Sequence, residues 1–213
     1  MALLYIDKVK QNKAGFEAKV IEIAQKLSID PNWLMVNMYS ESGLRSDIEN
    51  SIGCVGLIQF CPDNKSAGTK NIAGETVNLQ TLKNLSNVAQ LDYVYKYYAP
   101  YAGKITSFED LYMLDFFPIA LGWDDDRVIQ SSNLSASVIA KANPSFDTDK
   151  NGSITVGEFK KAVRKKLPLG YKTETGRAIM QVVSPVTDSP IVAGIIVVLF
   201  IVLIYLLFKN YKQ

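Results

Sequence analysis

The sequence predicts an all-α body followed by one C-terminal transmembrane helix. Two observations lead to this fold class. Apolar residues of the body recur at the spacing of a helical face. Residues 191–208 read IVAGIIVVLFIVLIYLLF, a run of 18 residues without a charge. As a helix this run spans about 27 Å, close to the hydrocarbon thickness of a bilayer.

The helices of the body are predicted from faces and caps. Asp30 followed by Pro31 predicts a helix start, since aspartate caps N-termini well and proline fits the first turn. Gly43 predicts the C-cap of that helix. Residues 44–76, rich in Gly, Ser, Asn and Asp, predict irregular loop with at most a small hairpin. The other helices are expected to cover residues 16–27, 79–98, 108–121, 134–142 and 156–166.

The ends of the chain predict a membrane protein with a single-pass C-terminal anchor. Pro190 precedes the apolar run, and Lys209, Tyr211 and Lys212 follow it as interfacial residues. The first residues lack the basic start and long apolar run of a signal peptide. We therefore expect the body to be made in the cytoplasm.

Composition excludes several kinds of chemistry. The chain has no histidine, so Ser-His and Cys-His nucleophiles and His-ligated zinc sites are excluded. The net charge of +2 gives no case for nucleic-acid binding. For Cys54 and Cys61 we expect two reduced thiols rather than a disulfide, because the cytosol is reducing.

Glu41 is the candidate catalytic residue. It stands at the predicted C-terminal end of the helix from Pro31, where the helix dipole disfavours a negative charge. Trp33, Met38 and Tyr39 predict apolar surroundings. Both effects would raise the pKa of the carboxyl group. A protonated glutamic acid is the group that protonates a departing glycosidic oxygen, although a solvated helix-end glutamate fits the position as well.

Two motifs around Glu41 carry a family resemblance. Glu41-Ser42-Gly43-Leu44, then Ser51, precede the segment Gly53-Cys54-Val55-Gly56-Leu57-Ile58-Gln59-Phe60. This pattern resembles the soluble lytic transglycosylases, over residues 16–122. The resemblance implies a lysozyme-like domain in which Glu41 is the acid/base, Ser42 orients the site and Gln59 contacts the substrate. Gly56 would permit the close turn before it.

The third motif of that family, Ala-Tyr-Asn-x-Gly, is missing. The comparable helix reads LYMLDFFPIALG at residues 111–122, where Tyr112 is the candidate replacement. A transglycosylase needs no second carboxylate, because the 6-hydroxyl of the sugar attacks and leaves a 1,6-anhydro end. An inverting hydrolase needs one roughly 6.5–9.5 Å from the first. The candidates for it are Asp47, Glu49, Asp63 and Asp115.

Residues 147–158 have the ligand spacing of an EF-hand calcium loop. Glycine stands at position six as Gly152 and an apolar residue at position eight as Ile154. We expect a structural calcium ion there, with no cofactor for catalysis. The predicted ligands are Asp147, Asp149, Asn151, Ser153 through its carbonyl group, and Glu158.

The chain is thus expected to hold a lysozyme-like catalytic domain at 1–132, an EF-hand-like segment at 133–167, a linker at 168–190 and a transmembrane helix at 191–208. The expected function is cleavage of the MurNAc-GlcNAc bond of peptidoglycan. A membrane-containing bacteriophage would use it when its genome crosses the wall, with virion structural proteins as further partners and a virion internal membrane as the location. The alternative is a calcium-binding, membrane-attached structural protein with a non-catalytic lysozyme-like fold.

Overall fold

The structure is a computed structural model that describes residues 2–171. Within these residues the chain forms seven α-helices, one two-stranded sheet and three short 3-10 helices. The helices and strands are α1 Lys13–Leu27, α2 Pro31–Ser42, β1 Thr69–Ile72, β2 Glu75–Asn78, α3 Leu79–Lys83, α4 Asn87–Tyr98, α5 Phe108–Phe116, α6 Ala136–Ala142 and α7 Val156–Arg164. The 3-10 helices are Ile6–Lys8, Ala99–Tyr101 and Pro118–Ala120.

The prediction of an all-α fold is wrong, because β1 and β2 form an antiparallel hairpin and make the fold mixed α/β. Ile72 pairs with Glu75, so the turn between the strands consists of Ala73 and Gly74. Both turn residues have positive φ, 52° and 88°. Such a two-residue turn matches the right-handed twist of the strands and closes a tight hairpin.

Helix α2 begins and ends where its caps predict. The Asp30 carboxylate accepts a hydrogen bond from the backbone N–H of Asn32 at 2.9 Å. Gly43 adopts φ 63° at the C-cap, and its N–H is bonded to backbone carbonyl groups of the last turn. These contacts fix where the helix ends, and therefore where Glu41 in its last turn lies.

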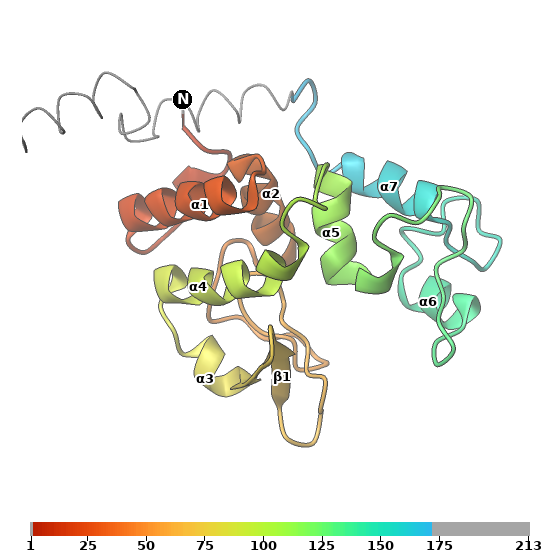
Figure 1. The fold of residues 1–213 in the computed structure, drawn as a ribbon, viewed down its shortest axis with the longest axis horizontal. Helices are drawn as coiled ribbons and strands as arrows, with labels where there is room; N and C mark the ends of the chain where they lie inside the picture. The colour runs from red at the N-terminus through yellow and green to blue at the C-terminus, as the bar shows by residue number, and fades with distance from the viewer. Residues whose placement is uncertain (1, 172–213) are drawn as a thin grey trace, which may run out of the picture.

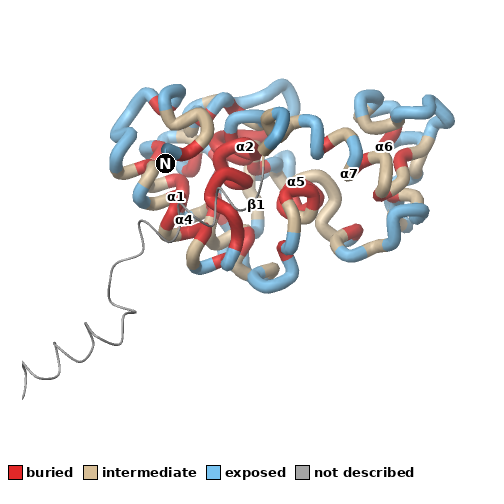
Figure 2. The backbone as a smooth tube through the Cα atoms, turned by 90° about the horizontal axis from the view of Figure 1, so that it is seen from above, coloured by how far each residue is buried: buried red, intermediate tan, exposed pale blue. Residues whose placement is uncertain are grey.

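The core joins helices that are far apart in sequence. Helix α1 packs against α2 and α4, and α2 packs against α5. Figure 2 shows the buried backbone concentrated along α1, α2, α4 and α5, with exposed loops around α6. The predicted face of α1 is fully buried, and it consists of Phe16, Val20, Ile23, Ala24 and Leu27.

The two largest differences from the predicted helices are a break in one and an early end of another. The one expected over 79–98 is divided into α3 and α4, and Ser86 starts α4 by accepting a hydrogen bond from the N–H of Ala89 at 3.2 Å. The one expected over 108–121 ends at Phe116, because Pro118 cannot continue the hydrogen-bond ladder.

Helix α5 lies between the α1–α2–α4 group and the C-terminal helices α6 and α7 (Figure 1). Phe116 of α5 stacks on Phe159 of α7, with ring centroids 4.8 Å apart. Phe146 contacts both rings from the loop before α7. The segment after residue 133 is therefore held against α5 by an aromatic cluster.

No helix within residues 2–171 is long and apolar enough to cross a membrane. The predicted transmembrane helix at 191–208, and all but the first four residues of the predicted linker at 168–190, lie outside the described residues. The predicted all-α lysozyme-like domain is thus replaced, within residues 2–171, by a mixed α/β body.

Candidate active site

Glu41 and Tyr112 meet across the contact between α2 and α5. Glu41 is half-buried in the last turn of α2, and Tyr112 is buried in the middle of α5. The phenol of Tyr112 donates a hydrogen bond to the Glu41 carboxylate. Burial, together with the negative charge of Glu41, raises the pKa of Tyr112 well above its usual value. Tyr112 thus remains a hydrogen-bond donor at every physiological pH.

The ring of Tyr112 is fixed from several sides. Phe108 contacts it edge-on at 5.9 Å between centroids, and Phe159 of α7 lies at 6.2 Å. The ammonium group of Lys166 lies 5.0 Å from the ring centroid. Phe159 and Lys166 belong to the segment after residue 133. This segment therefore supports the side chain that binds Glu41.

A second polar contact lies one helical turn away. Asn37 is on α2, four residues before Glu41, and Asp115 is on α5, three residues after Tyr112. The amide nitrogen of Asn37 donates to the Asp115 carboxyl group at 2.6 Å and to the Tyr98 phenol at 2.8 Å. Tyr98 in turn donates to Asp115, 2.7 Å from the nearer oxygen. Burial raises the pKa of Asp115 to about 8.

Ser42 lies beside the site and links two segments. Its hydroxyl oxygen is 2.9 Å from the carbonyl oxygens of both Met38 and Leu57, and it accepts from the N–H of Arg45 at 3.2 Å. The contact with Leu57 ties the end of α2 to the loop that carries Gln59. The role of Ser42 in orienting the site stays a prediction.

Gly56 permits a close backbone approach in that loop. Its φ is 73°, and a Cβ atom there would lie 2.3 Å from the side-chain oxygen of Gln90. Gln90 is fully buried and accepts from the N–H of Leu57 at 2.6 Å. Its amide nitrogen donates to the carbonyl groups of Ser46 and Leu82. Gln90 thus organises the loop, and the motif analysis missed it.

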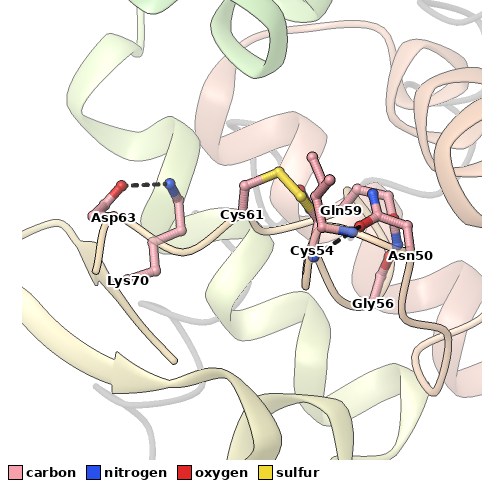
Figure 3. The surroundings of a disulfide bond; sticks show 8 residues. Asn50, Cys54, Gly56, Gln59, Cys61, Asp63 and Lys70 are labelled. Carbon is pink, nitrogen blue, oxygen red and sulfur yellow. Dashed lines mark hydrogen bonds and ion pairs between the residues drawn. A yellow bond between two sulfur atoms is a disulfide. The ribbon is translucent and has the colours of Figure 1, made fainter. Parts of the chain in front are cut away.

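Cys54 and Cys61 form a disulfide, so the prediction of two reduced thiols is wrong (Figure 3). The reason is the local backbone. Val55 and Phe60 form an antiparallel bridge with hydrogen bonds of 2.8 and 3.1 Å. The residues flanking such a pair lie opposite one another, and the Cα atoms of the two cysteines are 4.0 Å apart. The disulfide closes the loop that carries Gly56 and Gln59.

Gln59 and Asp115 line one small cavity. Its volume is about 40 Å³, enough for a water molecule or a small substituent. Gln59 adopts φ 53°, and its side chain donates to the carbonyl oxygen of Gly56 at 3.1 Å. The other residues of the lining are Ile58, Phe60, Cys61, Lys70 and Tyr97.

The other three candidate carboxylates differ from Asp115. Asp47, Glu49 and Asp63 are exposed, and each is ion-paired: with Arg45 at 3.1 Å, Lys83 at 2.9 Å and Lys70 at 3.2 Å, respectively. Hydrogen bonds from these cations lower the pKa of Asp47 and of Glu49. The structure therefore separates Asp115 from the other three candidate carboxylates, a distinction that could not be made from the sequence alone.

The predicted calcium loop brings three carboxylates together. One carboxylate oxygen from each of Asp147, Asp149 and Glu158 lies within 4.8 Å of the others, so this group could hold a metal ion. Asn151 and Ser153 lie in the same loop, where the Asn151 side-chain oxygen accepts from the N–H of Ser153 at 2.9 Å. The loop is tied to the body by a hydrogen bond of 2.8 Å from the N–H of Ile129 to the carbonyl group of Ile154.

A larger hollow, of about 660 Å³, lies at the other end of α5. Its lining includes Trp33, Phe108 and the paired Glu109 and Arg164, together with the last described residues up to Tyr171. Glu41, Gln59 and Asp115 are not in that lining. The hollow is thus separate from the candidate site.

Comparison with known proteins adds no assignment: no family model matches the chain, and neither a curated protein nor a solved structure matches it.

Proposed function

We propose that this protein cleaves the MurNAc-GlcNAc glycosidic bond of peptidoglycan, with Glu41 as the catalytic acid/base. The observation that carries the proposal is the hydrogen bond between the Glu41 carboxylate and the buried phenol of Tyr112. It supplies a tyrosine beside the glutamate, although the Ala-Tyr-Asn-x-Gly motif of the lytic transglycosylases is missing. The hydrogen bond from Ser42 to the carbonyl group of Leu57 ties the end of α2 to the loop that carries Gln59, which supports the roles that their motifs imply.

The reaction needs only one carboxyl group that changes protonation. Glu41 gives its proton to the glycosidic oxygen as the bond from C1 to that oxygen breaks. The 6-hydroxyl oxygen of the same sugar then bonds to C1 and returns its proton to Glu41. This forms a 1,6-anhydro ring, consumes no water and regenerates the acid. Because the nucleophile is part of the substrate, it is already held close to C1.

The state of the other carboxyl groups favours this non-hydrolytic route. Activation of a water molecule requires an ionised carboxylate as base. Burial raises the pKa of Asp115 to about 8, so its protonated form predominates at neutral pH. Asp47, Glu49 and Asp63 are engaged with surface cations. No candidate is therefore a free, ionised base at neutral pH.

Mass spectrometry of the digested wall tests the reaction type. Purified peptidoglycan would be incubated with the full-length protein, and the released muropeptides would be compared with those from a hydrolytic muramidase. Anhydro ends are lighter than hydrolysed ends by one water molecule. A product pool made only of reducing muramic ends would overturn the non-hydrolytic route.

We further propose that the loop at 147–158 binds calcium as a structural ion. The carboxylates of Asp147, Asp149 and Glu158 would supply ligands, together with oxygen atoms of Asn151 and Ser153. Calcium would join the start of α7 to the preceding loop. Since α7 contacts the ring of Tyr112 through Phe159, the ion would stabilise one side of the active site.

A further inference from the structure

Asp115 belongs to a buried polar network that crosses the α2–α5 contact. Asn37 and Tyr98, its two partners, are both fully buried. The side-chain oxygen of Asn37 is itself buried and has no hydrogen-bond partner among the described residues. An unpaired buried acceptor costs stability. The network thus retains one acceptor that its own donors do not reach.

Each hydrogen-bond donor of the network around Asp115 has an assigned acceptor. The Asn37 amide donates one N–H to Tyr98 and one to Asp115, and the Tyr98 phenol donates to Asp115. All three donors of the network are thereby used, and two of them point at the Asp115 carboxyl group. A proton on Asp115 is a fourth donor. The acceptors that remain for it are the side-chain oxygen of Asn37 and any group on the open side of the carboxyl group.

The open side is the cavity that Asp115 shares with Gln59. Gln59 is the residue whose motif implies substrate contact, and Glu41 is close enough for its charge to act on Asp115. The cavity is thus lined by one residue of the proposed site, Gln59. It is too small for a sugar ring but large enough for one oxygen-bearing substituent of a sugar.

Burial and one neighbouring charge raise the pKa of Asp115. Burial has the largest effect on its pKa, and the charge of Glu41 on α2 raises it further. Lys70 on β1, together with the hydrogen bonds from Asn37 and Tyr98, acts in the opposite direction but does not restore an ordinary value. The remaining titratable groups that face it are phenols with pKa values raised by burial, namely Tyr97, Tyr98 and Tyr112.

We propose that Asp115 is a second carboxyl group of the glycan-binding site, one that contacts the substrate as a neutral acid and donates a hydrogen bond to a sugar oxygen. The proposal rests on the glycan-cleaving function proposed above and adds a substrate contact to it. It also gives the site an upper pH limit. Ionisation of Asp115 removes the donor.

The test compares the pH profiles of Asp115→Asn and Asp115→Leu with that of the parent protein. The amide keeps a donor and an acceptor but does not titrate, whereas leucine has neither. The rate constant kcat/KM on soluble glycan strands would be measured from pH 5 to about pH 10, because this ratio reports groups of the free enzyme. Asp47→Asn, which neutralises an exposed carboxylate, is the matched control.

We expect the parent and Asp47→Asn to lose activity more steeply than Asp115→Asn as the pH rises through about 8, because in Asp115→Asn only the ionisation of Glu41 remains. Asp115→Leu should lose about tenfold in kcat/KM at pH 7, the effect of one hydrogen bond. If Asp115→Asn shows the same alkaline loss as the parent, or is as impaired as Asp115→Leu at pH 7, the proposal is overturned.

A ¹³C NMR titration of the Asp115 carboxyl group separates this proposal from the proposed function. Soluble glycan strands added to inactive Glu41→Gln should raise the midpoint of the titration, because the strand binds the protonated form. Lysis by the parent without any such shift would leave the proposed function standing and overturn the role of Asp115. Absence of both lysis and glycan-induced shifts would overturn the proposed function and this inference with it.

Discussion

The phenol of Tyr112 donates a hydrogen bond to the carboxylate of Glu41, across 71 positions of sequence. The contact joins the last turn of α2 to the middle of α5, and the ring is supported by Phe108 and Phe159. A carboxyl group that must give and then regain a proton at fixed positions benefits from such an anchor. The orientation of Glu41 therefore depends on the packing of α5.

Tyr112→Phe is expected to keep the fold and lose activity. The substitution removes only the hydroxyl group, and hydrogen bonds to charged groups are strong. We expect kcat to fall about 10- to 100-fold, while loss of the hydrogen bond lowers the stability of the fold by about 1.5–3 kcal/mol. Release of soluble muropeptides from purified peptidoglycan gives the rate. Tyr95→Phe, which lies on α4 away from Glu41, is the control. Unchanged activity of Tyr112→Phe would remove the hydrogen bond from the mechanism.

Asp115 should make stability depend on pH. Its pKa is about 8 in the folded protein and ordinary in the unfolded chain. Because the folded state holds the proton more tightly, the protonation of Asp115 stabilises the folded protein. This stabilisation is fully present below pH ~4 and is lost as the pH rises to about 8. Urea unfolding of the parent and of Asp115→Asn would be compared from pH 4 to 9. The free energy of unfolding of Asp115→Asn should increase relative to that of the parent as the pH rises through this range. Parallel profiles would contradict an elevated pKa.

The disulfide should stabilise the fold through the unfolded state. Linking residues seven positions apart removes loop entropy from the unfolded chain, worth about 2.5 kcal/mol. The double variant Cys54→Ser and Cys61→Ser should lose about this much free energy of unfolding in urea. A reducing agent should destabilise the parent and leave the variant unchanged. Equal sensitivity of the two proteins would show that the disulfide is not formed in solution.

Calcium should raise the melting temperature of the protein. Binding to the folded state alone adds about 2.7 kcal/mol at 100 times Kd, or about 5–10 °C for a chain of this size. Asp147→Ala and Glu158→Ala should abolish the shift, and Asp124→Ala, outside the loop, should not. Identical melting curves of the parent in calcium and in a chelator would rule the site out.

Local signals in the sequence were sufficient for α2 and for the position of Glu41. Asp30, Pro31 and Gly43 act through caps within a few residues, so their effect needs no knowledge of the rest of the fold. The hairpin was less predictable. Its strands are four residues long, and only Ile72 and Val77 are buried, which leaves no alternation to recognise.

Long-range contacts explain what the sequence did not disclose. Asp115 is singled out by Asn37 and Tyr98, which are 78 and 17 positions away. Nothing near Asp115 in sequence separates it from Asp47, Glu49 and Asp63. The disulfide was missed because the expectation rested on the redox compartment, whereas the bridge between Val55 and Phe60 brings the cysteines together.

The most direct test of the account is the lytic activity of Glu41→Gln. Glutamine has nearly the same shape but cannot give a proton to the glycosidic oxygen. The fall in turbidity of purified peptidoglycan would be measured for the parent and the variant, with equal melting temperatures as the control for folding. The account predicts lysis by the parent and none by Glu41→Gln. Activity of the variant within about tenfold of the parent would contradict it, because loss of a general acid costs about 10²–10⁴-fold.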